Sequence, residues 1–175
     1  LTGGGSSMPT VSGDGTEVLF MSDATNAVPG DGNAKTDAFI RNVNAGFTER
    51  ISVTSGEAAL TAGAVTASMS SNGRYVVFDS ATTQIPGDTD ASQDAFLRDR
   101  VLGSTEVVSI ANDGTASNQP CQFPVVSDNG RFVAFQTAAT GMTAVADSAD
   151  TDVFVRDRTT ATTKLVSLTD SDQPG

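Results

Sequence analysis

The sequence has no histidine, no tryptophan, one cysteine and one tyrosine in 175 residues. Without histidine the chain cannot form a Ser-His-Asp triad, supply a histidine general base or build most zinc and iron sites. The single cysteine, Cys121, excludes an internal disulfide and a multi-cysteine zinc site. With almost no Trp or Tyr, the chain also lacks the aromatic platforms on which sugars stack. These absences argue against an enzyme.

Positive charge is also scarce, because ten Lys and Arg stand against 21 Asp and Glu, which gives a formal net charge of −11. Nucleic acid and anionic membrane surfaces would both be repelled by such a chain. No apolar run approaches the roughly 18 residues that a membrane span needs. We therefore expect no nucleic-acid partner and no membrane insertion. The acidic, lysine-poor composition favours a secreted, periplasmic or cell-surface location in a bacterium.

What the chain does contain is a threefold internal repeat. The segments SGDGTEVLFMS, SSNGRYVVFDS and SDNGRFVAFQT place Gly15, Gly73 and Gly130 at one point, 58 and 57 residues apart. Two further blocks follow in each copy: TDAFIRN, QDAFLRD and TDVFVRD, then ERISV, EVVSI and KLVSL. A period of this length is typical of propellers and other repeat architectures.

Each block has the composition of a β-strand, because Val, Ile and Phe dominate short runs bounded by Gly, Asp, Asn and Ser. The Asp-Gly and Asn-Gly pairs predict two-residue type I′ hairpin turns. A short strand before each turn, in PTVS, ASMS and FPVVS, brings the count to four strands per copy. Both faces of RYVVFDS are largely apolar, as expected for a sheet packed between two others. The sequence therefore predicts an all-β propeller with three four-stranded antiparallel blades.

The pattern PxVSxDGRxVxFxS…PGDxNxxxDxFxRDR…VS resembles the TolB-type, WD40-like propeller repeat. The resemblance covers essentially the whole chain and is most specific in Ser127 to Phe135 and Asp94 to Arg100. Copy one departs from the pattern at Asn42, where the other copies have Asp99 and Asp157. The resemblance implies a propeller, which is a platform for many unrelated functions.

We assign residues 1–175 to one propeller segment, with blades at about 9–66, 67–123 and 124–175 and an inter-blade loop at 1–8. Three blades are fewer than the four to eight of typical rings, so an open arc would expose two apolar blade faces. We expect other blades to cover these faces. Either two copies form six blades, or three copies nine, by head-to-tail association, or flanking blades of a longer propeller do so.

The loop between the second and third strand of each copy is rich in oxygen ligands, in PGDGNAKTD, PGDTDASQD and ADSADTD. Side-chain oxygens at this spacing suit calcium rather than a transition metal. The alternative is that these residues cap turns by accepting backbone hydrogen bonds. Copies one and two match best, because the third loop is one residue shorter. The candidate metal ligands are Asp31, Asn33, Asp37, Asp88, Asp90, Asp94, Asp147, Asp150 and Asp152.

Other recurring residues have structural interpretations. Arg98 and Asp99, with Arg156 and Asp157, are expected to form ion pairs to neighbouring strands or blades. Cys121 is expected to be a packed, inert thiol. The repeated phenylalanines are assigned to packing between blades: Phe20, Phe39, Phe78, Phe96, Phe135 and Phe154.

Two functions follow. The first is a non-catalytic binding or scaffolding module for a protein, peptide or glycan partner, with calcium as a stabilising ion. The second is a self-assembling structural module whose only partner is another copy. A carboxylate-based glycoside hydrolase is the less favoured third interpretation, because the acids recur in every copy whereas an active site should break the repeat.

Overall fold

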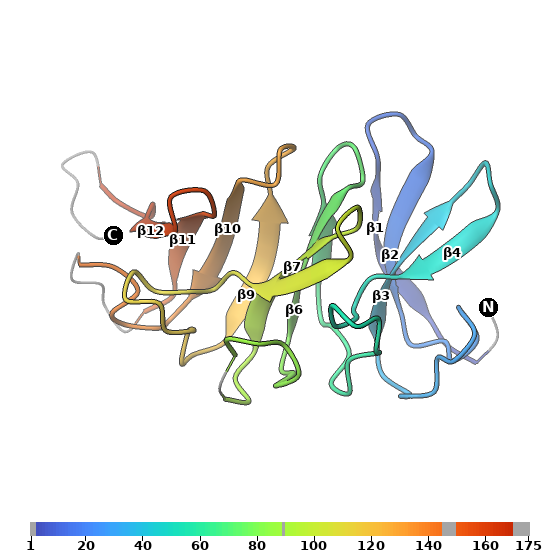
Figure 1. Cartoon of the computed structure of the whole chain (residues 1–175), viewed down its shortest axis with the longest axis horizontal. Helices are drawn as coiled ribbons and strands as arrows, with labels where there is room; N and C mark the ends of the chain where they lie inside the picture. Colours follow the sequence, from blue (N-terminus) through green and yellow to red (C-terminus); the bar gives the residue numbers. More distant parts are fainter. Residues whose placement is uncertain (1–2, 89, 145–149, 170–175) are drawn as a thin grey trace.

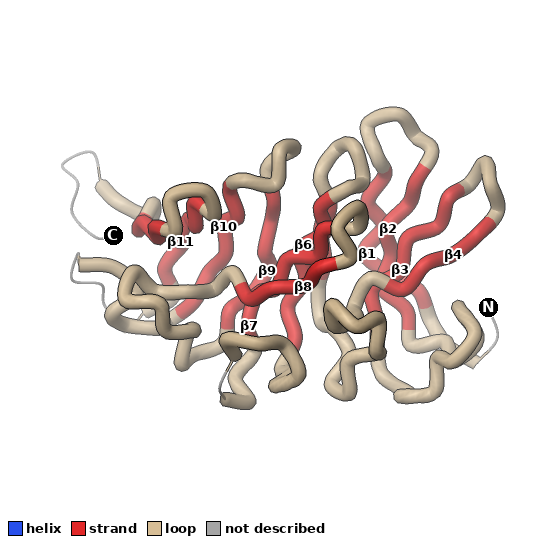
Figure 2. The backbone as a smooth tube through the Cα atoms, in the orientation of Figure 1, coloured by secondary structure: helices blue, strands red, loops and turns tan. Residues whose placement is uncertain are grey.

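The computed structural model describes residues 3–88, 90–144 and 150–169. In this part of the chain there are strands, turns and loops but no helix (Figure 2), and hence no helix that could cross a membrane. Three sheets lie side by side in chain order along the long axis of the molecule (Figure 1). Each sheet is one copy of the sequence repeat, and we call the three sheets blades 1, 2 and 3.

Every blade is a four-stranded antiparallel meander in which sequence neighbours pair. Blade 1 contains β1 (Ser6–Val11), β2 (Glu17–Ser22), β3 (Asp37–Asn42) and β4 (Phe47–Arg50). Blade 2 contains β5 (Ala67–Met69), β6 (Tyr75–Ser80), β7 (Asp94–Asp99) and β8 (Ser104–Val107). Blade 3 contains β9 (Cys121–Val126), β10 (Phe132–Thr137), β11 (Asp152–Asp157) and β12 (Thr162–Leu165). The predicted all-β architecture of three four-stranded blades is confirmed.

The first strands of blades 1 and 3 start earlier than the sequence pattern indicates. β1 begins at Ser6, inside the loop expected at 1–8, and β9 begins at Cys121, ahead of the blade boundary expected at 124. Both strands contain a register shift, and Met8 and Phe123 there have φ of 50° and 51°. A bulge interrupts the alternation of side chains, so the residues before it do not show a strand pattern.

The predicted two-residue type I′ turns are wrong. Among the turn residues Gly15, Gly73 and Gly130 have positive φ, between 68° and 73°, whereas the preceding Asp or Asn does not. The Ser12 N–H donates to the Glu17 carbonyl at 2.9 Å, which closes a loop of four residues. Such loops are built around a type I turn, and the Asp14 carboxylate supports this one by accepting from the Thr16 N–H at 3.0 Å.

The core consists of two apolar layers, one between each pair of neighbouring blades. Phe78 and Phe96 of blade 2 pack against blade 1, with ring centroids 5.7 Å apart. Phe135 and Phe154 of blade 3 pack against the opposite side of blade 2. The predicted role of these four rings in inter-blade packing is confirmed. The equivalent pair in blade 1, Phe20–Phe39, belongs to the side of that blade that faces away from blade 2.

Candidate functional site

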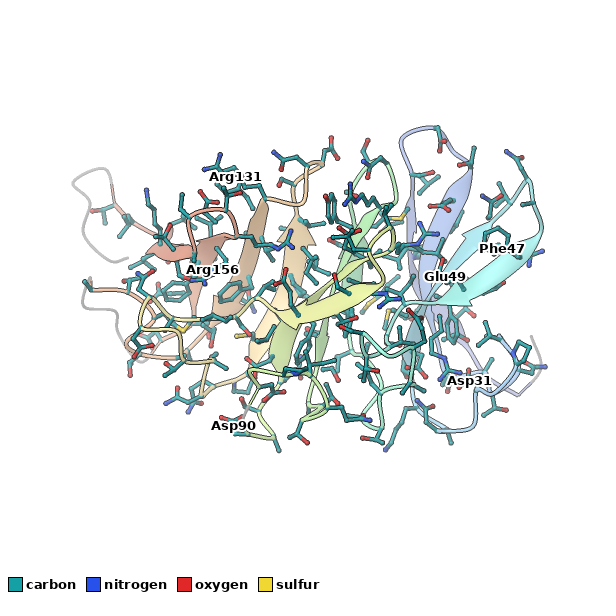
Figure 3. The ribbon with its side chains drawn as sticks, viewed as in Figure 1. Asp31, Phe47, Glu49, Asp90, Arg131 and Arg156 are labelled. Carbon is teal, nitrogen blue, oxygen red and sulfur yellow. The ribbon has the colours of Figure 1, made fainter. Side chains whose placement is uncertain are left out.

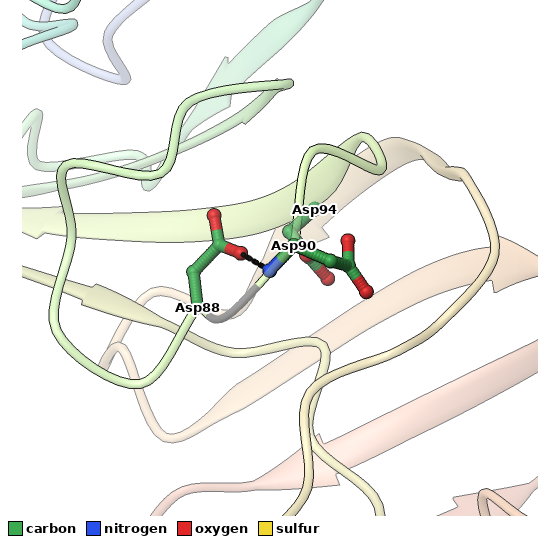
Figure 4. A group of neighbouring side chains, drawn as sticks. All are labelled: Asp88, Asp90 and Asp94. Atoms are coloured by element: carbon green, nitrogen blue, oxygen red, sulfur yellow. Dashed lines mark hydrogen bonds between the residues drawn. The ribbon is translucent and has the colours of Figure 1, made fainter.

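The aspartate loop of blade 2 brings three carboxylates together (Figure 4). Asp88 and Asp90 lie in the loop between β6 and β7, and Asp94 is the first residue of β7. One oxygen from each carboxylate lies within 4.8 Å of the others. Asp94 is fully buried and Asp88 is 8% exposed, whereas Asp90 faces solvent. The three residues therefore form a cluster that is closed on one side and open on the other.

Local hydrogen bonds hold one oxygen of each carboxylate and leave the other available. The Ser109 hydroxyl donates to Asp94 Oδ1 at 2.5 Å, and the Asp90 N–H donates to Asp88 Oδ1 at 3.2 Å. The Ser92 N–H donates to Asp90 Oδ1 at 2.7 Å. The second oxygens of Asp88 and Asp94 are buried and have no hydrogen-bond partner among the described residues.

The electrostatics of this cluster follow from burial. Desolvation raises the pKa of Asp94 to about 7, and the negative charges of Asp88 and Asp90 act in the same direction. Desolvation also raises the pKa of Asp88. Taking a carboxylate out of water without a partner disfavours its charged form. The cluster is thus a place where a positive charge would be strongly favoured.

The equivalent loop of blade 1 is arranged differently. Arg50, the last residue of β4, places its guanidinium 3.5 Å from Asp31 Oδ1 and 4.0 Å from Asp37 Oδ2. Asn33 Nδ2 donates to Asp37 Oδ2 at 2.8 Å, while Asn33 Oδ1 accepts from the Lys35 N–H at 3.0 Å. The Asn33 amide therefore caps this turn with its oxygen and binds the Asp37 carboxylate with its nitrogen.

Sequence reasoning missed Arg50, although the signal was present. Arg50 stands where the other copies have Val107 and Leu165, so the repeat alignment marks it as the one charged residue at that position. In the third loop Asp147 lies outside the described residues. Asp152 accepts from the Ser167 hydroxyl at 2.7 Å, and its Oδ2 is buried without a hydrogen-bond partner in residues 3–88, 90–144 and 150–169. In the described part of the chain, the residues grouped around a possible metal position are Asp88, Asp90 and Asp94, without Asp150.

The second feature of the molecule is a set of charged contacts between blades. Arg100, just after β7, donates to Glu17 at 2.7 Å, to Glu49 at 2.9 Å and to the Gly73 carbonyl at 2.7 Å. Arg158 occupies the same position after β11 and binds Glu106 of blade 2. A polar groove of about 400 Å³ lies beside Arg100 and is lined by residues of blades 1 and 2.

The expected ion pairs of strands β7 and β11 are largely confirmed. Arg98 binds Glu57, which follows blade 1's last strand. Asp99 accepts from Arg74 at 2.8 Å, and Asp157 accepts from Arg131 at 2.6 Å. Arg156, which is labelled in Figure 3, differs, because it donates to the Ile110 carbonyl at 3.4 Å and to Thr163 at 3.2 Å. Its guanidinium thus binds neutral groups.

Apolar side chains are exposed at both ends of the arc. The blade 1 outer face comprises Val11, Val18, Phe20, Arg41, Val43 and Thr48. The blade 3 outer face comprises Val125, Phe132, Val153, Val155 and Lys164. Val11 is 61% exposed, whereas its counterpart Met69 in blade 2 is buried in the inter-blade core, and Val125 is 53% exposed. The two exposed blade faces expected from the sequence are present.

Cys121 is fully buried at the start of β9. Burial raises the pKa of its thiol to about 11, so almost none of it is thiolate at neutral pH. The expectation of an inert, packed cysteine agrees with this environment.

No protein-family model matches the sequence, and no curated protein sequence matches it. Solved structures do match. A TolB-type protein from Agrobacterium tumefaciens superposes with a TM-score of 0.54 at 16% identity, over 89% of this chain and 46% of its own. The β-propeller domain of the Trilobed protease from Pyrococcus furiosus, described as having an open velcro topology, gives 0.56 at 10% identity, over 92% and 41%.

The chain has a TolB-like propeller fold. A structure from a study of two prolyl endopeptidases also matches, with a TM-score of 0.52 at 13% identity, over 93% of this chain and 22% of that one. This TolB-like segment spans less than half of the length of each of these proteins. At such identities the likeness shows the fold alone. Completion of the three-blade arc by other blades or chains is consistent with that fold.

Proposed function

We propose that this chain is a non-catalytic scaffold module that binds a second copy of itself head to tail, so that the blade 3 outer face of one copy covers the blade 1 outer face of the other. Two copies would give six blades, within the usual range of four to eight, whereas three copies would give nine. A reciprocal pair of such contacts closes a ring with twofold symmetry. The pairing of residues across the internal blade interfaces carries this proposal.

One pair of repeat positions meets at each internal interface, where an arginine is kept and its partner differs. Between blades 1 and 2, Glu17 binds Arg100. Between blades 2 and 3, the Tyr75 ring lies under the Arg158 guanidinium at 5.9 Å. Phe132 of blade 3 shares the repeat position of Glu17 and Tyr75, and Val43 of blade 1 shares that of Arg100 and Arg158. These two residues would meet where blade 3 of one copy contacts blade 1 of the other.

Phe132 and Val43 are both apolar, and they are 39% and 51% exposed. The charged partner is therefore missing from both sides at once, which makes the two outer faces complementary to each other. Lys164 stands where the other blades have Glu49 and Glu106, so no acid of blade 3 is left opposite Val43. Its long side chain can carry the ammonium to the solvent-exposed edge of the interface.

A second contact recurs at both internal interfaces, and each outer face carries one of its two partners. Thr105 Oγ1 donates to the Val53 carbonyl of the preceding blade at 2.7 Å, and Thr163 Oγ1 donates to the Ile110 carbonyl in the same way. In blade 1 the equivalent residue is Thr48, which accepts from Arg41 at 3.2 Å just as Thr105 accepts from Arg98. Leu168 of blade 3 occupies the repeat position of Val53 and Ile110, so its carbonyl would accept from Thr48 of the second copy.

The proposal also covers the absence of catalysis, the class of ligand, the location of the protein and the role of flanking blades. The absence of histidine and the burial of Cys121 support a non-catalytic role. A protein, peptide or glycan ligand would find polar groups in the groove beside Arg100. The acidic composition supports a secreted, periplasmic or cell-surface location. Flanking blades of a longer polypeptide would use the same two outer faces as a second copy.

Light scattering across a range of protein concentrations tests the assembly. We expect a mass near twice 17.8 kDa at high concentration. Val125→Glu places a charge on the blade 3 outer face and should return the mass to that of one chain. Val101→Glu is the matched control, because Val101 is 70% exposed on a turn outside both outer faces. A single-chain mass for the unmodified protein at every concentration would overturn the proposal.

A further inference from the structure

The loops of blades 1 and 2 pose one electrostatic problem and solve it differently. Asp31 and Asp37 correspond to Asp88 and Asp94 in the repeat, and both pairs are at most 8% exposed. Two carboxylates that share a buried site repel each other and are poorly solvated, so the site needs a compensating positive charge.

In blade 1 that charge comes from the chain itself. The Arg50 side chain is 7% exposed, and its guanidinium lies beside both Asp31 and Asp37. The third position of the loop is Asn33, a neutral residue whose amide nitrogen donates to Asp37. The loop therefore combines two carboxylates with one cation.

Blade 2 has different residues at the two positions that Arg50 and Asn33 occupy in blade 1. Val107 takes the place of Arg50, and Asp90 takes the place of Asn33, so the loop has one more negative charge and one less positive charge. None of the ion pairs found in residues 3–88, 90–144 and 150–169 involves Asp88, Asp90 or Asp94. The charge that blade 1 supplies internally has no counterpart here.

Two carboxylate oxygens of blade 2 indicate that a bound cation supplies the positive charge. Asp88 Oδ2 and Asp94 Oδ2 are buried and find no hydrogen-bond partner in the part of the chain that the structure describes, in residues that are 8% and 0% exposed. Buried carboxylate oxygens in native proteins are almost always bonded to a donor, an ion or water. Two unpartnered oxygens in one cluster mark a position that something else fills.

The geometry suits calcium. Two oxygens on one calcium ion, each at 2.3–2.6 Å, can lie at most about 5 Å apart, and the three carboxylates meet within 4.8 Å. Calcium accepts six to eight oxygens in flexible arrangements, so water can complete the shell on the exposed side beside Asp90. Magnesium demands a stricter octahedron, and transition metals favour nitrogen or sulfur ligands.

We propose that Asp88, Asp90 and Asp94 bind one calcium ion, and that the Arg50 guanidinium takes the place of this ion in the equivalent loop of blade 1. The proposal narrows the predicted set of ligands to blade 2. It is independent of self-assembly, because all three ligands come from one blade of one chain.

Calorimetric titration of the full chain with calcium chloride, after removal of metal by a chelator, tests the site. We expect one calcium per chain and a melting temperature that rises with calcium. Asp90→Asn should weaken binding by at least about tenfold, because it removes one charged ligand. Asp14→Asn is the matched control, since Asp14 is an exposed aspartate of blade 1 that caps a turn by accepting from Thr16, and it should bind like the unmodified protein.

The outcomes separate a site from general screening of a chain with a net charge of −11. Absence of binding heat together with an unchanged melting temperature at millimolar calcium would overturn the proposal. Equal losses in Asp90→Asn and Asp14→Asn would do the same, as would magnesium binding as tightly as calcium.

A transplant tests the role of Arg50. The double variant Asn33→Asp with Arg50→Val gives blade 1 the residues of blade 2. Arg50 lies on the side of blade 1 that faces away from blade 2, so the replacement does not disturb the inter-blade core. We expect two calcium ions per chain. A folded double variant that still binds one ion would show that Arg50 does not replace a cation.

Discussion

The Tyr75 ring of blade 2 packs directly on the backbone of Gly130 in the hairpin turn of blade 3. A Cβ atom at Gly130 would lie 2.6 Å from three carbon atoms of the Tyr75 ring. The equivalent glycine of blade 1, Gly15, has no atom within 4 Å of such a Cβ. The turn of blade 3 is therefore part of an inter-blade contact, whereas the turn of blade 1 is open.

This difference predicts unequal effects of alanine at the two glycines. Both have similar φ, 73° at Gly15 and 68° at Gly130, so the backbone cost of about 1–2 kcal/mol is common to both. Gly130→Ala must also displace the Tyr75 ring, and we expect it to lower the free energy of unfolding by about 1–3 kcal/mol more than Gly15→Ala. Urea denaturation measures both, and equal losses would contradict the contact.

Arg98 and Arg41 occupy the same repeat position but differ in environment. Arg98 is 3% exposed and donates to Thr105 and to the Thr54 carbonyl of blade 1, whereas Arg41 is exposed. Arg98→Ala leaves buried acceptors without a donor, and we expect a loss of about 2–4 kcal/mol in unfolding free energy. Arg41→Ala should cost under about 0.5 kcal/mol in the single chain. In light scattering, however, Arg41→Ala should weaken association, because Arg41 lies on the blade 1 outer face, at the position from which Arg98 contacts the preceding blade. An unchanged dimer would argue against a contact between Arg41 and the second copy.

Arg100 should stabilise the protein more than Arg131. Arg100 bridges Glu17 and Glu49 of blade 1, and its side chain is 14% exposed. Arg131 is 41% exposed and pairs within its own blade, with Asp157. Removing one partner of a largely desolvated network costs about 2–4 kcal/mol, whereas exposed pairs contribute about 0–1 kcal/mol. We expect Arg100→Gln and Arg131→Gln to differ accordingly in urea midpoint, and similar midpoints would contradict this ranking.

Most of the fold was predictable because the repeat encodes it three times. Gly15, Gly73 and Gly130 fix the positions of the hairpins, and the alternating apolar strands between them indicate sheets packed on both sides. The early starts of β1 and β9 were not predictable, since the bulges at Met8 and Phe123 interrupt the alternation. The turn type was also mistaken, because an Asn-Gly or Asp-Gly pair suits a four-residue loop as well as a two-residue one.

The candidate site was only partly predictable. The spacing of Asp88, Asp90 and Asp94 identified the loop, but spacing alone treats the loop of blade 1 as equivalent. Arg50 distinguishes them, and it lies on β4, thirteen residues after Asp37. Antiparallel pairing of Phe39 with Arg50 places it next to the loop, and that proximity is a property of the folded sheet.

The Asp99–Arg74 pair predicts loss of stability in acid. Hydrogen bonding to the Arg74 guanidinium holds the pKa of Asp99 below its usual value, against the opposing effect of burial. A carboxylate whose pKa is lowered by folding stabilises the protein above its unfolded pKa, which is about 3.9. That contribution is lost as the pH falls from about 5 through the lower folded pKa.

We therefore expect the urea midpoint of Asp99→Asn to fall less steeply than that of the unmodified protein between pH 5 and pH 2. Arg74→Gln should show the same reduced slope, and the double variant should lose little more, because both changes remove one interaction. An unchanged acid slope in both single variants would show that other carboxylates cause the loss.

Cys121 provides a direct measure of how tightly blades 2 and 3 hold together. The thiol is fully buried in the layer between these blades, and burial raises its pKa to about 11. Alkylation requires both access and the thiolate, so iodoacetamide at pH 8 should react with the folded protein far more slowly than with the protein in urea. Gly130→Ala, which loosens the Tyr75 contact between the same blades, should accelerate the reaction of the folded form, whereas Gly15→Ala, at the far end of the arc, should affect it less. Mass spectrometry of the modified chain follows both rates. Accelerations that match the loss of unfolding free energy in each variant would mean that the thiol is exposed by global unfolding rather than by separation of blades 2 and 3.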